Sequence, residues 1–181
     1  MTAHIQPRAG EPNDTSPLNK WNIATRPLSW WSDPGWEARE HVVDAAERAG
    51  AVENDPRALT VHAYAAPIEC GSVVTKWLDS APSSAETNAE LARGYGSAAV
   101  VIGSFELAPR FLATAVDGLR SQGRLGNLAR LLVIQSWDAT CLGEWPTALS
   151  MADEAERLAA ETSEPVWAAG AQAITSRGSE A

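Results

Sequence analysis

The sequence has few of the residues on which several classes of site depend. Its two cysteines, Cys70 and Cys141, have neither CxxC nor zinc-ligand spacing, and we expect both to be small buried apolar residues in a reducing compartment. The only lysines are Lys20 and Lys76, and neither follows a glycine-rich turn. This absence excludes the phosphate-binding loop of an NTPase.

Long apolar runs are also missing. No stretch of 18 apolar residues occurs, and residues 1–20 have no apolar segment of the kind found in signal peptides. The sequence therefore predicts a cytoplasmic protein without a membrane span. Positive charge is scarce as well, because 14 Lys and Arg against 23 Asp and Glu give a net charge of −9, which opposes binding to nucleic acid.

What the sequence does contain favours helices. Its 181 residues suffice for one domain or a short repeat array, and 45% of them are apolar. Alanine alone occurs 33 times, more often than the β-branched residues that sheets favour, since Val, Ile and Thr together number 28. We predict an all-α fold.

The first part of the chain differs in composition. Residues 1–28 contain four prolines and many small polar residues, which predicts a disordered arm. Tryptophans then cluster at Trp30, Trp31 and Trp36. They indicate either a contact with a partner or part of a core.

Residues 29–82 carry the signals of three N-terminal helices. Asp33-Pro34 and Asp55-Pro56 each place a capping residue before a proline, predicting helices over 36–50 and 56–65. A third helix is predicted over 72–80. Downstream, Ser83 and Glu86 have the spacing of a capping box, which predicts that a helix opens at Glu86.

Residues 83–181 carry a repeat. Helices are predicted over 86–103, 104–123, 124–143, 144–162 and 164–181, and similar residues recur forty positions apart. Examples are Gly103 with Gly143, Phe105 with Trp145, and Ala115 with Ala155. This pattern predicts stacked helical hairpins, a TPR-like short α-solenoid, in which the last unit ends after one helix.

No motif points to catalysis or to a cofactor. Gly94–Ala99 fits the GxGxxA pattern, but it lies within a helical pattern, which indicates helix packing. His4, His41 and His62 stand singly, without HExxH or GxSxG motifs. We therefore expect no enzyme, no metal and no cofactor; a small helical enzyme would require His41 or His62 beside a carboxylate.

Binding on the concave face of the repeats is the alternative that we favour. Asp138 follows Trp137 in an otherwise apolar helix, and it lies either at the exposed edge of that helix or against a ligand. Its burial would require a partner such as Arg93, Arg110 or Arg130. We predict a ligand site formed by Arg93, Tyr95, Trp137 and Asp138, for a protein, a peptide or a small inducer. The absence of capping helices also predicts self-association.

Residues 96–174 include the phrases FELAPRFLATAVDGLRSQGRLG, LGEWPTAL, ADEAERLAAET and PVWAAG. With the preceding WWSDPGWEAREHVVDAAERAG, they resemble the helical-repeat arm of large actinobacterial LuxR-family regulators of the MalT-like ATPase type. The resemblance covers roughly residues 29–175.

In that family an ATPase domain precedes the repeats and a helix-turn-helix domain follows them, and this sequence shows motifs of neither. The resemblance implies a segment of transcriptional signal transduction that senses an inducer or partner. The alternative is a truncated or split remnant of such a regulator with little independent function.

Overall fold

The computed structural model describes residues 36–48 and 56–178, and this part of the chain is all-helical. The predicted all-α fold is thereby confirmed. The predicted arm over residues 1–28, the side chains of Trp30, Trp31 and Trp36, and Gly50 lie outside the residues whose structure can be described. Within the described ranges, no helix has the length and apolar character that crossing a bilayer requires.

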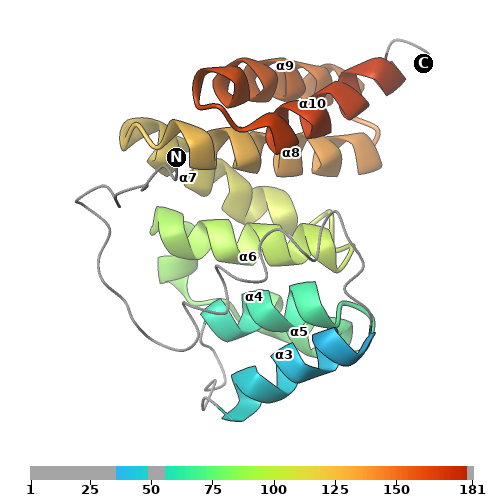
Figure 1. The fold of residues 1–181 in the computed structure, drawn as a ribbon. Coiled ribbons are helices and arrows are strands. Elements are labelled where there is room, and N and C mark those ends of the chain that lie inside the picture. The colour runs from blue at the N-terminus through green and yellow to red at the C-terminus, as the bar shows by residue number, and fades with distance from the viewer. Residues whose placement is uncertain (1–35, 49–55, 179–181) are drawn as a thin grey trace, which may run out of the picture.

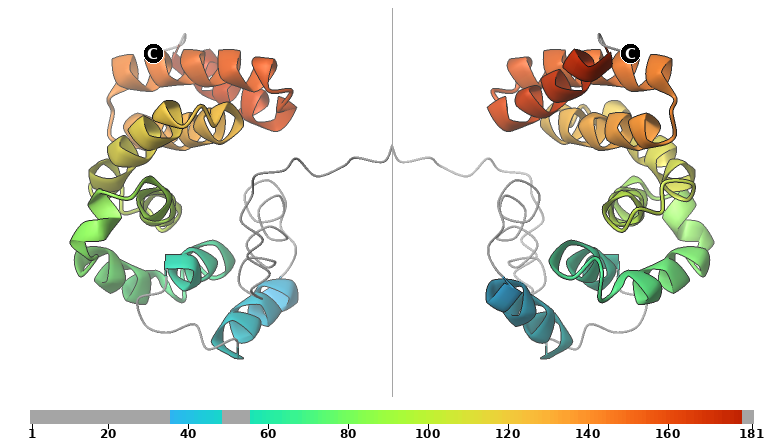
Figure 2. Two further views of the ribbon diagram at one scale, coloured as in Figure 1. Left: turned by 90° about the vertical axis from the view of Figure 1, so that its left-hand side faces the viewer. Right: turned by 90° about the vertical axis from the view of Figure 1, so that its right-hand side faces the viewer.

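The helices follow one another from α3 at one end of the molecule to α9 and α10 at the other (Figures 1 and 2). Their bounds are α3 Trp36–Arg48, α4 Pro56–Ala65, α5 Gly71–Asp79, α6 Ala89–Val101, α7 Ala108–Ser121, α8 Leu125–Cys141, α9 Trp145–Glu161 and α10 Pro165–Gly178. A 3-10 turn, η1, spans Ser83–Glu86.

The last five helices form two rows. Helix α8 packs against both α6 and α10, so these three helices make one row. The other two helices, α7 and α9, make the second row and pack against the first: α7 contacts α6 and α8, and α9 contacts α8 and α10. Helix α8 is consequently buried on most of its sides, as its apolar sequence predicts.

One prediction about a helix start is wrong. The capping box of Ser83 and Glu86 does not open α6, because these residues form η1. Instead, α6 begins after Asn88, whose side-chain oxygen accepts hydrogen bonds from the amides of Glu90 (3.0 Å) and Leu91 (3.1 Å). An asparagine before the first turn caps its free amides as well as the predicted serine would.

The turns between α6 and α10 recur every twenty residues. Gly103, Gly123, Gly143 and Ser163 have positive φ angles of 79°, 65°, 78° and 58°. After each of them, the next amide donates to a carbonyl five residues back: Ser104 to Ala99, Arg124 to Leu119, Glu144 to Ala139 and Glu164 to Ala159, at 2.8–3.1 Å. This arrangement closes the end of a helix, and it favours glycine at the residue with positive φ.

Buried positions recur with the forty-residue spacing that the sequence shows. The buried side of α7 includes Ala108, Leu112, Ala115 and Leu119, and that of α9 consists of Ala148, Ala152, Ala155 and Ala159. Helices α8 and α10 begin forty residues apart, and so do the last residues of α7 and α9. The α6–α7 and α8–α9 hairpins therefore share the positions at which their helices end, their turns and their buried positions, although their helices begin 36 and 37 residues apart.

Close contact in the α6–α7 hairpin depends on glycine. A Cβ at Gly96 would lie 2.6 Å from Leu112 Cδ2, and one at Gly118 would lie 2.1 Å from the Ala89 Cβ. Forty residues after Gly96 and Leu112 stand Ser136 and Ala152, both fully buried. In the second hairpin serine replaces the glycine and is larger, while alanine replaces the leucine and is smaller, so the volume packed between the two helices stays similar.

Candidate functional site

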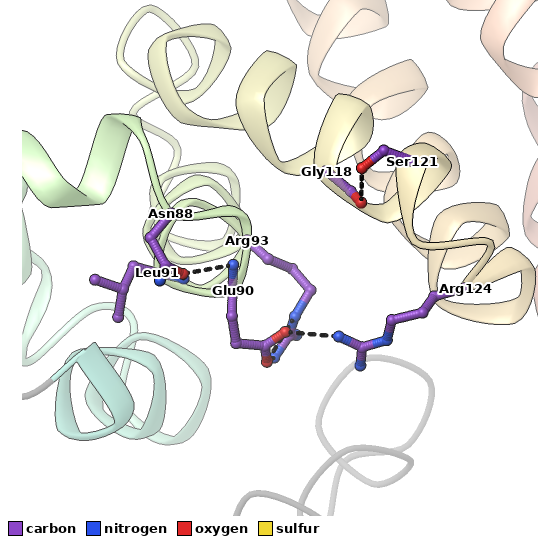
Figure 3. Close-up of polar contacts among 7 residues, drawn as sticks. All are labelled: Asn88, Glu90, Leu91, Arg93, Gly118, Ser121 and Arg124. Atoms are coloured by element: carbon purple, nitrogen blue, oxygen red, sulfur yellow. Dashed lines mark hydrogen bonds and ion pairs between the residues drawn. The ribbon is translucent and has the colours of Figure 1, made fainter. Parts of the chain in front are cut away.

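A charged cluster joins the first turn of α6 to the start of α8. One Glu90 oxygen lies 2.5 Å from Arg93 Nη2 on the same helix, and the other lies 3.2 Å from Arg124 Nη1 (Figure 3). Arg124 directly follows the turn at Gly123 and precedes α8. The turn geometry therefore places a guanidinium from a distant part of the chain against a carboxylate on α6.

The electrostatics of this cluster favour an ionised Glu90. Partial burial raises the pKa of Glu90, but the hydrogen bond and charge of Arg93 and those of Arg124 outweigh it and leave the pKa below its ordinary value. Two guanidiniums and one carboxylate leave the cluster with a positive charge. This sign is opposite to the net charge of the whole chain.

The cluster depends on the close approach of α6 and α7. Gly118 lies on α7 against Ala89, at the start of α6, and its carbonyl accepts a 2.9 Å hydrogen bond from the Ser121 hydroxyl (Figure 3). Since Ala89 immediately precedes Glu90, a larger residue at position 118 would move Glu90 relative to Arg124.

A second cationic group links α8 to α10. The Arg130 guanidinium lies over the Trp167 ring, with its carbon 5.2 Å from the ring centroid. Such a contact stabilises the packing of the two helices by a cation–π interaction. Arg130 also stands forty residues after Glu90, so the two side chains occupy equivalent places in the two hairpins.

The structure places the four predicted site residues in different environments. Arg93 belongs to the charged cluster. Tyr95 is only 2% exposed and packs against Phe111 with ring centroids 5.4 Å apart, so it is part of the core. Trp137 is half-buried against the same core. The four residues therefore do not all reach one accessible surface.

Asp138 does not lie at the exposed edge of its helix, which was one of its two predicted positions. It is 2% exposed, and its Oδ1 atom has no hydrogen-bond partner among the described residues. Burial, together with the charge of Glu144, raises the pKa of Asp138 to about 7.

None of the three arginines that were expected as partners for Asp138 pairs with it. Arg93 pairs with Glu90, Arg110 with Glu86, and Arg130 stacks on Trp167. The raised pKa explains how the carboxyl is accommodated, because the neutral acid is cheaper to bury than the anion.

Sequence reasoning did not find Glu90 or Arg124 as site residues. The spacing of Glu90 and Arg93 on one helix face is a local signal that could have found that pair. Arg124 carries no such signal, because it meets Glu90 only after the α6–α7 hairpin has formed. Within the described ranges, no group of three His, Cys, Asp or Glu residues is arranged to hold a metal ion.

Comparisons with protein-family models, with curated proteins and with solved structures found no match.

Proposed function

We propose that this protein is a non-catalytic, TPR-like recognition scaffold that binds a protein, a peptide or a small inducer. One observation carries the proposal: helix ends, turns and buried positions recur with a forty-residue spacing in α6–α10. Hairpins that repeat in this way stack through the same faces and leave an extended outer surface for ligands. The resemblance to the sensor segment of LuxR-family regulators favours the same function.

The row of α6, α8 and α10 is the surface that we assign to the ligand. Equivalent positions of stacked helices face the same side, so Glu90 and Arg130 lie on one face, which we call the arginine face. It contains Glu90, Arg93, Arg124, Arg130 and Trp167. Forty residues after Arg124 stands Glu164, whose carboxylate lies beside Gly126 on α8, so three arginines face two carboxylates and leave a small positive charge, which favours an acidic ligand.

Selection from a random peptide library displayed on phage tests this proposal. We expect acid-rich peptides to be enriched, and we expect them to lose about tenfold in affinity, or about 1.4 kcal/mol, when Arg93 or Arg130 is replaced by alanine. The matched control is Arg157→Ala, because Arg157 lies exposed on α9 in the other row. A thermal-shift screen of small anionic compounds against the same variants tests the alternative of a small inducer.

Two results would contradict the proposal. In the first, neither peptides nor compounds bind above the level of an unrelated helical protein. In the second, binding is found but Arg157→Ala weakens it as much as Arg93→Ala and Arg130→Ala do, in which case the ligand does not use the arginine face.

A further inference from the structure

A cysteine and a histidine that do not belong to the arginine face meet at the α4–α5 junction. The Cys70 sulfur lies 3.7 Å from His62 Nδ1, within the range of a hydrogen bond to sulfur. The histidine lies on α4, and Cys70 is the residue that immediately precedes α5.

The backbone and a neighbouring ring hold this pair in place. The Ala66 amide donates to the His62 carbonyl (3.1 Å), and the Cys70 amide donates to the Ala66 carbonyl (2.9 Å), so two successive turns bring residues 62 and 70 together. The imidazole also contacts the Trp77 ring edge to face, with centroids 5.9 Å apart. Cys70, at the N-cap of α5, and Trp77, on α5, are seven residues or about two helical turns apart, so both side chains lie on the side of α5 that meets His62.

The neighbouring imidazole and the start of α5 both favour the thiolate form of Cys70. With the proton of the imidazole on Nε2, the Nδ1 atom can accept the thiol proton and form a thiolate–imidazolium ion pair. The positive end of the α5 dipole lies at Cys70 and stabilises a negative charge there.

Cys141 has the opposite setting. It is the last residue of α8, at the negative end of the helix dipole, and burial and the charge of Asp138 raise the pKa of its thiol. The expectation that both cysteines are buried is wrong, because Cys141 is exposed and Cys70 is only half-buried, and neither is in a disulfide. Exposure alone would therefore make Cys141 the more reactive of the two.

We propose that Cys70 is a reactive thiol, activated by His62, that forms mixed disulfides with low-molecular-weight disulfides. The Cys70 proton passes to His62 Nδ1, and the thiolate attacks one sulfur of the incoming disulfide. A new bond forms to the Cys70 sulfur while the original S–S bond breaks, and the departing thiolate takes up a proton from the imidazolium or from solvent. This site is independent of the proposed scaffold function.

Single-cysteine variants test the proposal. Cys141→Ser leaves Cys70, Cys70→Ser leaves Cys141, and each is reacted with the aromatic disulfide DTNB, whose cleavage releases a coloured thiolate. At neutral pH we expect Cys70 to react about tenfold faster than Cys141, the gain that a modest increase in thiolate content supplies. Reaction with glutathione disulfide, followed by intact mass, should add one glutathionyl group at Cys70 first.

A histidine substitution separates activation from simple access. In the Cys141→Ser background, His62→Gln should slow the DTNB reaction about tenfold, whereas His41→Gln, which changes an exposed histidine on α3, should not. Circular dichroism checks that each variant is folded, and in denaturant all variants should react at one rate. The proposal is overturned if Cys70 reacts no faster than Cys141, or if a folded His62→Gln variant keeps the full rate.

Discussion

Asp138 provides the sharpest test of how this fold is stabilised, because its carboxyl is buried and its Oδ1 atom has no hydrogen-bond partner within residues 36–48 and 56–178. Replacing it with asparagine keeps the shape and removes the charge. In the unfolded chain the carboxyl has its ordinary pKa of about 3.8, whereas in the folded protein the pKa is about 7. Between these two values the unfolded chain ionises while the folded protein keeps the proton.

The sign of the effect follows from this difference. The contribution of Asp138 to stability is fully present below pH 3.8, and it is lost as the pH rises toward and through 7. The full pKa difference of roughly 3 corresponds to about 4 kcal/mol, of which about 2.5 kcal/mol falls between roughly pH 5 and pH 8. Asparagine has no such dependence, so the advantage of Asp138→Asn over the native chain should grow by that amount over the same interval.

Urea denaturation followed by far-UV circular dichroism at several pH values between these limits measures the effect. The difference between the two proteins cancels the titration of all other groups. Asp153→Asn, a change at an exposed position of α9, serves as the control and should show no growing advantage. A constant difference between native and Asp138→Asn proteins across this pH range would refute the reasoning, since it would mean that the carboxyl is solvated in the folded state.

Four further substitutions, one of them a control, test the packing, the charged cluster and the turns by the same denaturation assay. Gly118→Ala should lower the free energy of unfolding by about 1–3 kcal/mol, because the new Cβ would overlap that of Ala89. The control Gly126→Ala, whose Cβ would meet nothing closer than 3.8 Å, should raise the free energy of unfolding by about 0.5–1 kcal/mol. Equal effects of the two substitutions would contradict the close contact at Gly118. Glu90→Gln should cost about 1 kcal/mol or less at low salt and nothing at high salt, and a loss that persists at high salt would show a role beyond charge. Ser163→Gly should raise the free energy of unfolding by up to about 1 kcal/mol, because Ser163 has a φ of 58°, and a loss of stability would indicate that the hydroxyl is needed.

Predictions that depend on neighbouring residues were largely right. Pro56 begins a helix, α4 ends before Pro67, and Gly103 and Gly143 end helices at positive φ. Each of these outcomes is set by the allowed backbone angles of one residue and the amides beside it. Two helix starts are exceptions. Helix α7 begins at Ala108, four residues after its predicted start, and at the capping box of Ser83 a rival cap lies five residues later at Asn88.

The sequence by itself thus determined an all-helical chain, the place of most helix ends and the forty-residue recurrence, because these depend on local backbone preferences and on the spacing of apolar residues. Only the tertiary structure decided that Asp138 is buried without an arginine, that Tyr95 is a core residue, that Glu90 meets Arg124, and that Cys70 meets His62. Each of these outcomes depends on which surfaces two helices bring together. A contact between segments that are many residues apart cannot be predicted from the residues adjacent to either one in the sequence.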